Sequence, residues 1–145
     1  MRENTKKALD ALEHGEYTIV LCNGEQVYSD TKRGVAPLLS LLDSEADVSG
    51  YSAADKVVGA GAAYLYVLLG VCEIYAAVIS EGAKRILLSH GIDVFFGETV
   101  PHIINRKGDG ICPIELAVSD ARDASDALKK IKNRLKELNA NTVEK

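Results

Sequence analysis

Cysteine is scarce in this sequence. The chain of 145 residues contains three, Cys22, Cys72 and Cys112, and none of them forms the CxxC spacing that is typical of metal sites. An odd number of widely separated cysteines also argues against a disulfide framework. The sequence therefore predicts no bound metal, no cofactor and a reduced, cytoplasmic setting.

Two kinds of apolar segment are also missing. The N-terminus has no apolar stretch of the kind found in a signal peptide. The uncharged run at residues 57–72 is shorter than the roughly 20 residues that a membrane-spanning helix needs, and Glu73 follows it directly. Gly70 marks a place where a helix would end, because glycine accepts the left-handed conformation past a helix C-terminus. We therefore expect no membrane association.

The composition is that of an ordinary globular domain. Hydrophobic residues make up 47% of the chain and charged residues 26%. The net charge of −4 gives no general affinity for nucleic acid, and the lysine-rich last helix has no interleaved aromatic residues on which bases could stack. We expect one domain at residues 1–138, a frayed tail at residues 139–145, and no nucleic-acid partner.

Periodicity and turn signals predict alternating helices and strands. The Asn23-Gly24 pair predicts a hairpin between strands at 17–22 and 25–29, because a type I′ turn needs positive φ at both central positions. Further strands are expected at 74–79, 92–96 and 100–104. Helices are expected at 5–14, 37–42, 81–91 and 125–138, with a central buried helix that begins at Ser52. This order predicts an α/β fold with a mixed sheet and helices on both faces.

The predicted start of the central helix is the first candidate site. Ser52 and Asp55 have the spacing of a capping box, and that structural role alone would explain Asp55. Lys56 would oppose the helix dipole there, so it either reaches to solvent or contacts an anionic ligand. Gly59 and the small residues after it allow a sheet or a ligand to approach closely. The free N–H groups of such a helix start favour anions.

The second candidate site is the glycine-rich segment 105–115, which contains Asn105, Arg106, Cys112 and Glu115. Arg106, like Arg33 earlier in the chain, can bind a carboxylate or phosphate; the alternative is a solvated loop side chain. Cys112 precedes a proline that can open a helix, so its thiol could be activated as a nucleophile. The alternative is that Cys112 is a small buried apolar residue and Glu115 an ordinary acid of a first helical turn.

These motifs resemble those of an uncharacterised prokaryotic family of unknown function that is grouped with the cytidine-deaminase-like fold. The resemblance rests on residues 54–59 (ADKVVG) together with the pattern NRxGxGxCPxE at 105–115, and it extends over nearly the whole chain from the hairpin onward. It implies a three-layer α/β/α sandwich around a mixed, roughly five-stranded sheet.

The resemblance also implies that the zinc signature is missing. In zinc deaminases of that fold, a His-x-Glu or Cys-x-Glu sequence opens the central helix and Pro-Cys-x-x-Cys opens the next one. This chain has Asp55-Lys56 at the first place and the sequence SEGA of residues 80–83 at the second. We therefore expect no stoichiometric zinc, which elemental analysis would test.

Together these arguments predict a zinc-free pocket for a small polar ligand, with a nucleotide-like molecule as one candidate. The candidate residues are Cys112, Asp55 and Glu115 for catalysis, and Lys56, Arg106, Asn105, Arg33 and Gly59 for ligand binding. The sequence leaves open whether the protein is an enzyme. The alternatives are a non-catalytic binding or regulatory module, and an interaction protein that works as a homo-oligomer.

Overall fold

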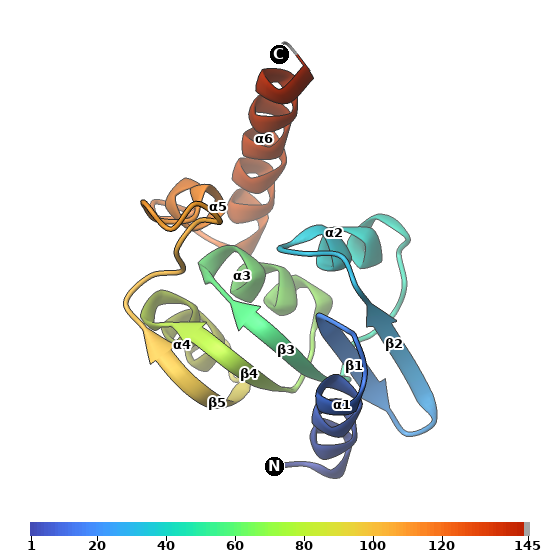
Figure 1. Ribbon diagram of the computed structural model, residues 1–145. Helices are drawn as coiled ribbons and strands as arrows, with labels where there is room; N and C mark the ends of the chain where they lie inside the picture. The colour runs from blue at the N-terminus through green and yellow to red at the C-terminus, as the bar shows by residue number, and fades with distance from the viewer. Residues whose placement is uncertain (144–145) are drawn as a thin grey trace.

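A five-stranded mixed sheet forms the centre of the structure, a computed structural model that describes residues 1–143. The strands lie in the order β2-β1-β3-β4-β5 (Figure 1). Strand β1 is antiparallel to β2 and to β3, whereas β3, β4 and β5 are parallel. The strands are β1 (Ile19–Asn23), β2 (Gln26–Asp30), β3 (Ser52–Val58), β4 (Glu73–Ser80) and β5 (Asp93–Val100). The predicted fold class and strand number are confirmed.

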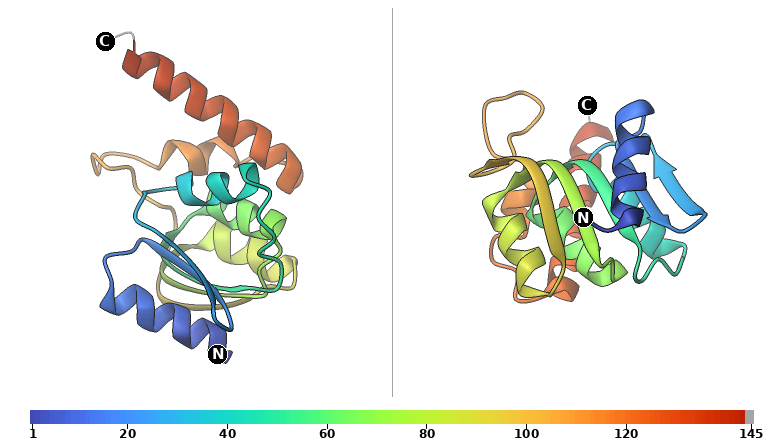
Figure 2. Two further views of the ribbon diagram at one scale, coloured as in Figure 1. Left: turned by 90° about the vertical axis from the view of Figure 1, so that its right-hand side faces the viewer. Right: turned by 90° about the horizontal axis from the view of Figure 1, so that it is seen from below.

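Helices lie on both sides of this sheet (Figure 2). Helix α1 covers one face, where Ala8 and Leu12 pack against Val20 and Ala54. Helices α2, α3 and α4 lie on the other side, and α5 and α6 pack against the outside of α3. The helices are α1 (Glu3–His14), α2 (Ala36–Asp43), α3 (Ala60–Leu69), α4 (Glu81–Ser89), α5 (Pro113–Ala117) and α6 (Ala124–Val143).

Residues 52–58 form strand β3, so the prediction that the central helix begins at Ser52 is wrong. This strand lies between β1 and β4, and both of its faces are covered. Ala53 packs in the main core beneath α3, and Ala54 packs against α1. A strand that is buried on both faces has no alternation of polar and apolar residues, so its sequence can look like a buried helix.

The helix begins at Ala60 instead, with Gly59 at its N-cap position. Two predictions that depended on a helix start at Ser52 are therefore also wrong. Ser52 and Asp55 do not form a capping box, because both lie within a strand. Lys56 does not oppose a helix dipole, for the same reason.

The remaining boundaries agree more closely with the sequence. Ser80 caps α4, because its hydroxyl accepts a 3.2 Å hydrogen bond from the backbone N–H of Ala83. Strand β5 extends without interruption to Val100. A further strand was predicted at 100–104, but Ile104 forms an isolated bridge with Ile111 there. Helix α6 continues past residue 138 to Val143. Of the tail predicted to fray, residues 144–145 lie outside the described residues.

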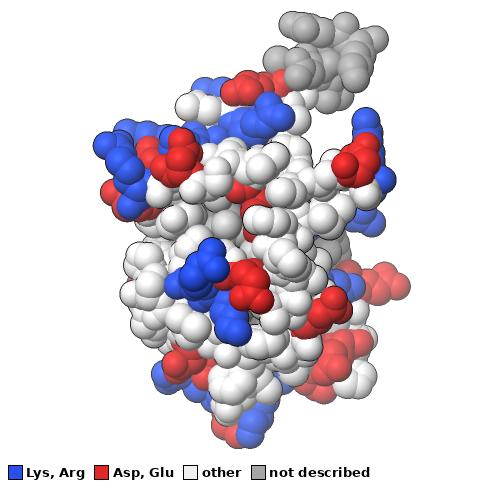
Figure 3. Space-filling view, turned by 90° about the vertical axis from the view of Figure 1, so that its left-hand side faces the viewer, with Lys and Arg blue, Asp and Glu red and all other residues white. Residues whose placement is uncertain are grey.

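Acidic partners accompany several of the basic side chains of α6. The ammonium group of Lys130 lies 3.5 Å from Asp120 and 3.9 Å from Asp126, and that of Lys132 lies 3.5 Å from Asp43. The side of the molecule formed by α4 and β5 likewise has basic and acidic side chains next to one another (Figure 3). None of the described helices is long and apolar enough to cross a lipid bilayer.

Candidate functional site

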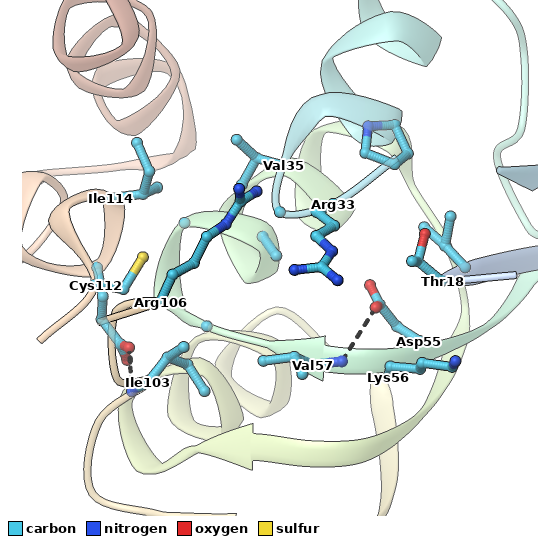
Figure 4. Close-up of a pocket in the computed structure, with 17 residues that line it drawn as sticks. Thr18, Arg33, Val35, Asp55, Lys56, Val57, Ile103, Arg106, Cys112 and Ile114 are labelled. Carbon is cyan, nitrogen blue, oxygen red and sulfur yellow. Dashed lines mark hydrogen bonds between the residues drawn. The ribbon is translucent and has the colours of Figure 1, made fainter. Parts of the chain in front are cut away.

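A cavity of about 440 Å³ opens at the carboxyl end of β3. Its walls come from β3, the first turn of α3, the segment that leads into α2, and the segment 103–115 (Figure 4). All of the predicted candidate residues except Asn105 line it. The carboxyl ends of parallel strands are where α/β sheets commonly bind ligands, and this volume suits a small molecule.

Asp55 is the buried acid of this cavity, with 8% of its surface exposed. Strand alternation directs its side chain toward α3, where the hydroxyl of Tyr66 donates a 2.6 Å hydrogen bond to Oδ2. The backbone N–H of Val57 donates to Oδ1 at 3.3 Å. Burial raises the pKa of Asp55 to about 7, although these hydrogen bonds act in the opposite direction. Burial and the neighbouring carboxylate also raise the pKa of Tyr66 well above its usual value.

Glu115 is a second buried acid, with 7% of its surface exposed. Its Oε2 accepts a 2.5 Å hydrogen bond from the backbone N–H of Ile103, which joins α5 to the segment that follows β5. The same oxygen would lie 3.5 Å from a Cβ atom placed on Gly59. Glu115 therefore lies beside the start of α3.

The start of α3 has no side-chain cap. Gly59 occupies the N-cap position and contributes no side-chain acceptor. A Cβ atom there would lie 3.1 Å from the side chain of Ile103, which favours glycine at this position. The first N–H groups of a helix have no partner within the helix and bear a partial positive charge. Gly59, Gly61 and Ala62 all line the cavity, so this positive end of α3 forms part of its wall.

Arg33 and Arg106 bring two positive charges to the cavity from separate loops. Both side chains are exposed, and Figure 4 shows both reaching into the cavity. Within the described part of the chain, neither guanidinium forms an ion pair or a hydrogen bond. Gly34 follows Arg33 with a φ of 65°, a left-handed conformation that glycine adopts without strain.

Lys56 and Asn105 have different positions from those the sequence suggested. Lys56 borders the cavity, but strand alternation sends its side chain to the opposite side of β3 from Asp55, and Figure 4 shows it pointing away. Asn105 is not part of the cavity lining. Its side-chain amide donates to Asp109 at 2.9 Å and its side-chain oxygen accepts from the Asp109 backbone at 3.2 Å. Asn105 thus braces the loop that contains Arg106.

Cys112 lies in the cavity wall, half-buried, with its thiol directed toward the interior (Figure 4). Pro113 is the first residue of α5, as predicted, and Cys112 is at the N-cap position. The thiol itself makes no capping hydrogen bond. The backbone N–H of Cys112 donates to the carbonyl of Ile103 at 2.8 Å, which fixes the position of the residue.

The residues at the two helix starts offer no metal ligands of the deaminase type. Because α3 begins at Ala60, the position where the resemblance places a His-x-Glu sequence holds Gly59, Ala60 and Gly61, and the start of α4 has the sequence SEGA. Elsewhere in the described residues, no group of three histidine, cysteine, aspartate or glutamate side chains is placed to hold a metal ion.

Tyr66 is the site residue that the sequence analysis missed. It lies in the middle of an apolar helix, where its ring is indistinguishable from any other core side chain by pattern alone. One signal was available: a buried tyrosine hydroxyl requires a hydrogen-bond partner, and Asp55 is the acid that precedes this helix. Thr18, Ile103 and Ile114, which also line the cavity, have no such signal.

A crystal structure of a DUF1893 family protein from Thermotoga maritima is similar with a TM-score of 0.82 and 23% identity, over 94% of this chain and 92% of that chain. A diaminohydroxyphosphoribosylaminopyrimidine deaminase/5-amino-6-(5-phosphoribosylamino)uracil reductase from the same organism is only weakly similar. Its TM-score is 0.42 at 12% identity, over 79% of this chain and 40% of that chain. No curated protein matches the chain.

The match to a sequence family covers most of the chain. The family model described as "Domain of unknown function (DUF1893)" matches residues 7–135. The chain therefore belongs to the DUF1893 family.

Proposed function

We propose that the cavity at the end of β3 binds a small anionic molecule, such as a nucleotide, through a phosphate or carboxylate group. The observation that supports this most directly is that two guanidinium groups without partners among the described residues, those of Arg33 and Arg106, meet the uncapped start of α3. Arginine binds such groups with two parallel hydrogen bonds. The N–H groups of a helix start supply further donors.

The two buried acids suit the rest of such a ligand. Glu115 is a hydrogen-bond acceptor beside Gly59, and Asp55, with a pKa of about 7, can either donate or accept a proton near neutral pH. A second candidate function follows from the thiol of Cys112, which lines the same cavity as Asp55. In that case the protein is an enzyme in which the thiolate of Cys112 forms a bond to the ligand as a leaving group departs with the electron pair of the broken bond, and Asp55 donates a proton to that group.

Calorimetric titration with inorganic pyrophosphate tests the anion site. Replacing Arg33 or Arg106 by glutamine should weaken binding by about tenfold or more, since each replacement removes a charge-assisted hydrogen bond. Lys107→Gln is the matched control, because Lys107 is an exposed neighbour of Arg106 that does not line the cavity. Failure of pyrophosphate to bind, or an equal loss in the control, would contradict the proposal.

Cys112→Ser separates the two candidate functions. In a binding module the variant should hold pyrophosphate as tightly as the unaltered protein does. In an enzyme, a bound nucleotide should be converted by the unaltered protein and not by the variant, which mass spectrometry of the ligand would detect.

A further inference from the structure

A second cavity of about 340 Å³ lies on the other side of the start of α3. Gly59 lines the first cavity and Ala60 lines the second, so both cavities border the start of α3. The second cavity is bounded by α4, by α5 and by the segment after β5, and its lining includes Tyr64, Arg85 and Leu116. Nothing in the proposed anion site uses it.

Glu115 lines both cavities. Its Oε2 is occupied by the backbone N–H of Ile103, but none of the described residues donates a hydrogen bond to its Oε1. Oε1 is nevertheless open to solvent, because among the described residues the hydroxyl of Thr5 is the one buried side-chain atom without a hydrogen-bond partner. A solvent-accessible carboxylate oxygen of a residue that lines both cavities can accept a hydrogen bond from a ligand there.

The walls of the second cavity combine flat and apolar surfaces. Tyr64 contributes an aromatic ring from α3, and Arg85 contributes a guanidinium from α4 that has no ion pair in the described structure. Both groups stack on planar rings. Ile86 and Leu116 add aliphatic surface. Gly82 leaves room in the wall of the second cavity, because a Cβ atom added there would come no closer than 3.9 Å to any neighbour.

We propose that the second cavity holds a planar ring of the ligand whose anionic group lies in the first cavity, and that Oε1 of Glu115 accepts a hydrogen bond from an amino or N–H group of that ring. The ligand class is thus a phosphorylated molecule with a nitrogen-bearing ring, of which a nucleoside monophosphate is the simplest example. This inference rests on the proposed function, because the first cavity must hold the anion.

The test compares probes that differ only in the ring. Ribose 5-phosphate has the phosphate and the sugar, and adenosine and cytidine 5′-monophosphate add a purine or a pyrimidine. We expect at least one monophosphate to bind the unaltered protein about tenfold more tightly than ribose 5-phosphate, as measured by calorimetry.

Glu115→Gln should remove this advantage, so that the monophosphates bind no more tightly to the variant than ribose 5-phosphate does. Glutamine keeps the size of the side chain and an oxygen for the Ile103 N–H, but it presents an N–H₂ group where the ring donor would lie. Arg85→Gln, at an exposed position, provides a second variant that leaves the core intact. It should weaken monophosphate binding alone, by about two- to fivefold.

Each outcome decides between the two proposals. Equal binding of ribose 5-phosphate and both monophosphates overturns the ring site and leaves the anion site standing. A loss of equal size for all three probes in Glu115→Gln also overturns it, because Glu115 would then only position the segment at Ile103. Failure of pyrophosphate and of every phosphorylated probe to bind overturns the anion site, and the ring site with it.

Discussion

The hydroxyl of Tyr66 donates a 2.6 Å hydrogen bond to Oδ2 of Asp55, and both side chains are buried between β3 and α3. This pair joins the central strand to the helix that begins at the cavity. Because burial favours the neutral form of a carboxyl group, the pair also makes the stability of the protein depend on pH.

The first prediction concerns that pH dependence. The pKa of Asp55 is raised from 3.8 to about 7 by folding, so the folded chain holds this proton more tightly than the unfolded chain does. The resulting stability is fully present below about pH 3.8 and is lost as the pH rises through about 7. In urea unfolding between pH 5 and 8, the free energy of unfolding of the unaltered protein should therefore fall relative to that of Asp55→Asn. The prediction would be wrong if the free energies of unfolding of the two proteins changed in parallel with pH. Glu16→Gln, which removes an exposed carboxylate, is the control.

Tyr66→Phe should lower the free energy of unfolding by about 1.5–3 kcal/mol at pH 8, where Asp55 is mostly charged. The loss should be smaller at pH 5, where the hydrogen bond joins two neutral groups. Tyr64→Phe is the matched control on the same helix, because no described residue bonds to the Tyr64 hydroxyl. Its stability should change by less than about 0.5 kcal/mol. A similar loss in both variants would mean that the hydroxyl of Tyr66 has no special role.

Gly61→Ala should destabilise the protein by about 1–3 kcal/mol in thermal or urea unfolding. An alanine Cβ at this position would lie 2.5 Å from a methyl group of Ile114, which must move into the cavity or outward with α5. Gly82→Ala, in the first turn of α4, meets nothing closer than 3.9 Å. It should leave stability unchanged or raise it by up to about 1 kcal/mol, since alanine favours a helix. The opposite order of stability would contradict the packing argument.

Cys112 should be the first of the three cysteines to react with iodoacetamide in the folded protein. Its thiol lines an open cavity, whereas Cys22 is buried and the thiol of Cys72 donates to the carbonyl of Gly50 at 3.2 Å. Mass spectrometry after a limited reaction near neutral pH measures the order of labelling. Earlier labelling of Cys72 or Cys22 would remove Cys112 as the nucleophile.

The sequence predicted which residues gather at the cavity better than it predicted the element on which Asp55 lies. Ser52, Ala53 and Ala54 resemble a capped helix start because alanine has high helix propensity and a fully buried strand lacks alternation. Gly59 marked the boundary between β3 and α3, since glycine suits an N-cap position and interrupts both a strand pattern and a helix pattern. Asp55 still reaches the cavity because β3 leads directly into α3.

The loops were predictable for a different reason. Arg33 and Arg106 each stand near glycines, in segments with no apolar periodicity, so their place on loops follows from local chemistry. The hydrogen bonds of Asn105 to Asp109, and of Glu115 to Ile103, depend on how those segments fold back in space. No spacing in the sequence encodes these contacts, and the same holds for the second cavity.

The positive and negative groups of the first cavity differ in the kind of backbone that supports them. Asp55 and Glu115 lie on a strand and a helix, whereas Arg33 and Arg106 lie on connecting loops. Loops accept insertions and exchanges that strands and helices do not. Under the proposed function, transplanting either arginine loop between proteins of this fold should change which anion is selected, with the acid pair and the folding core left in place.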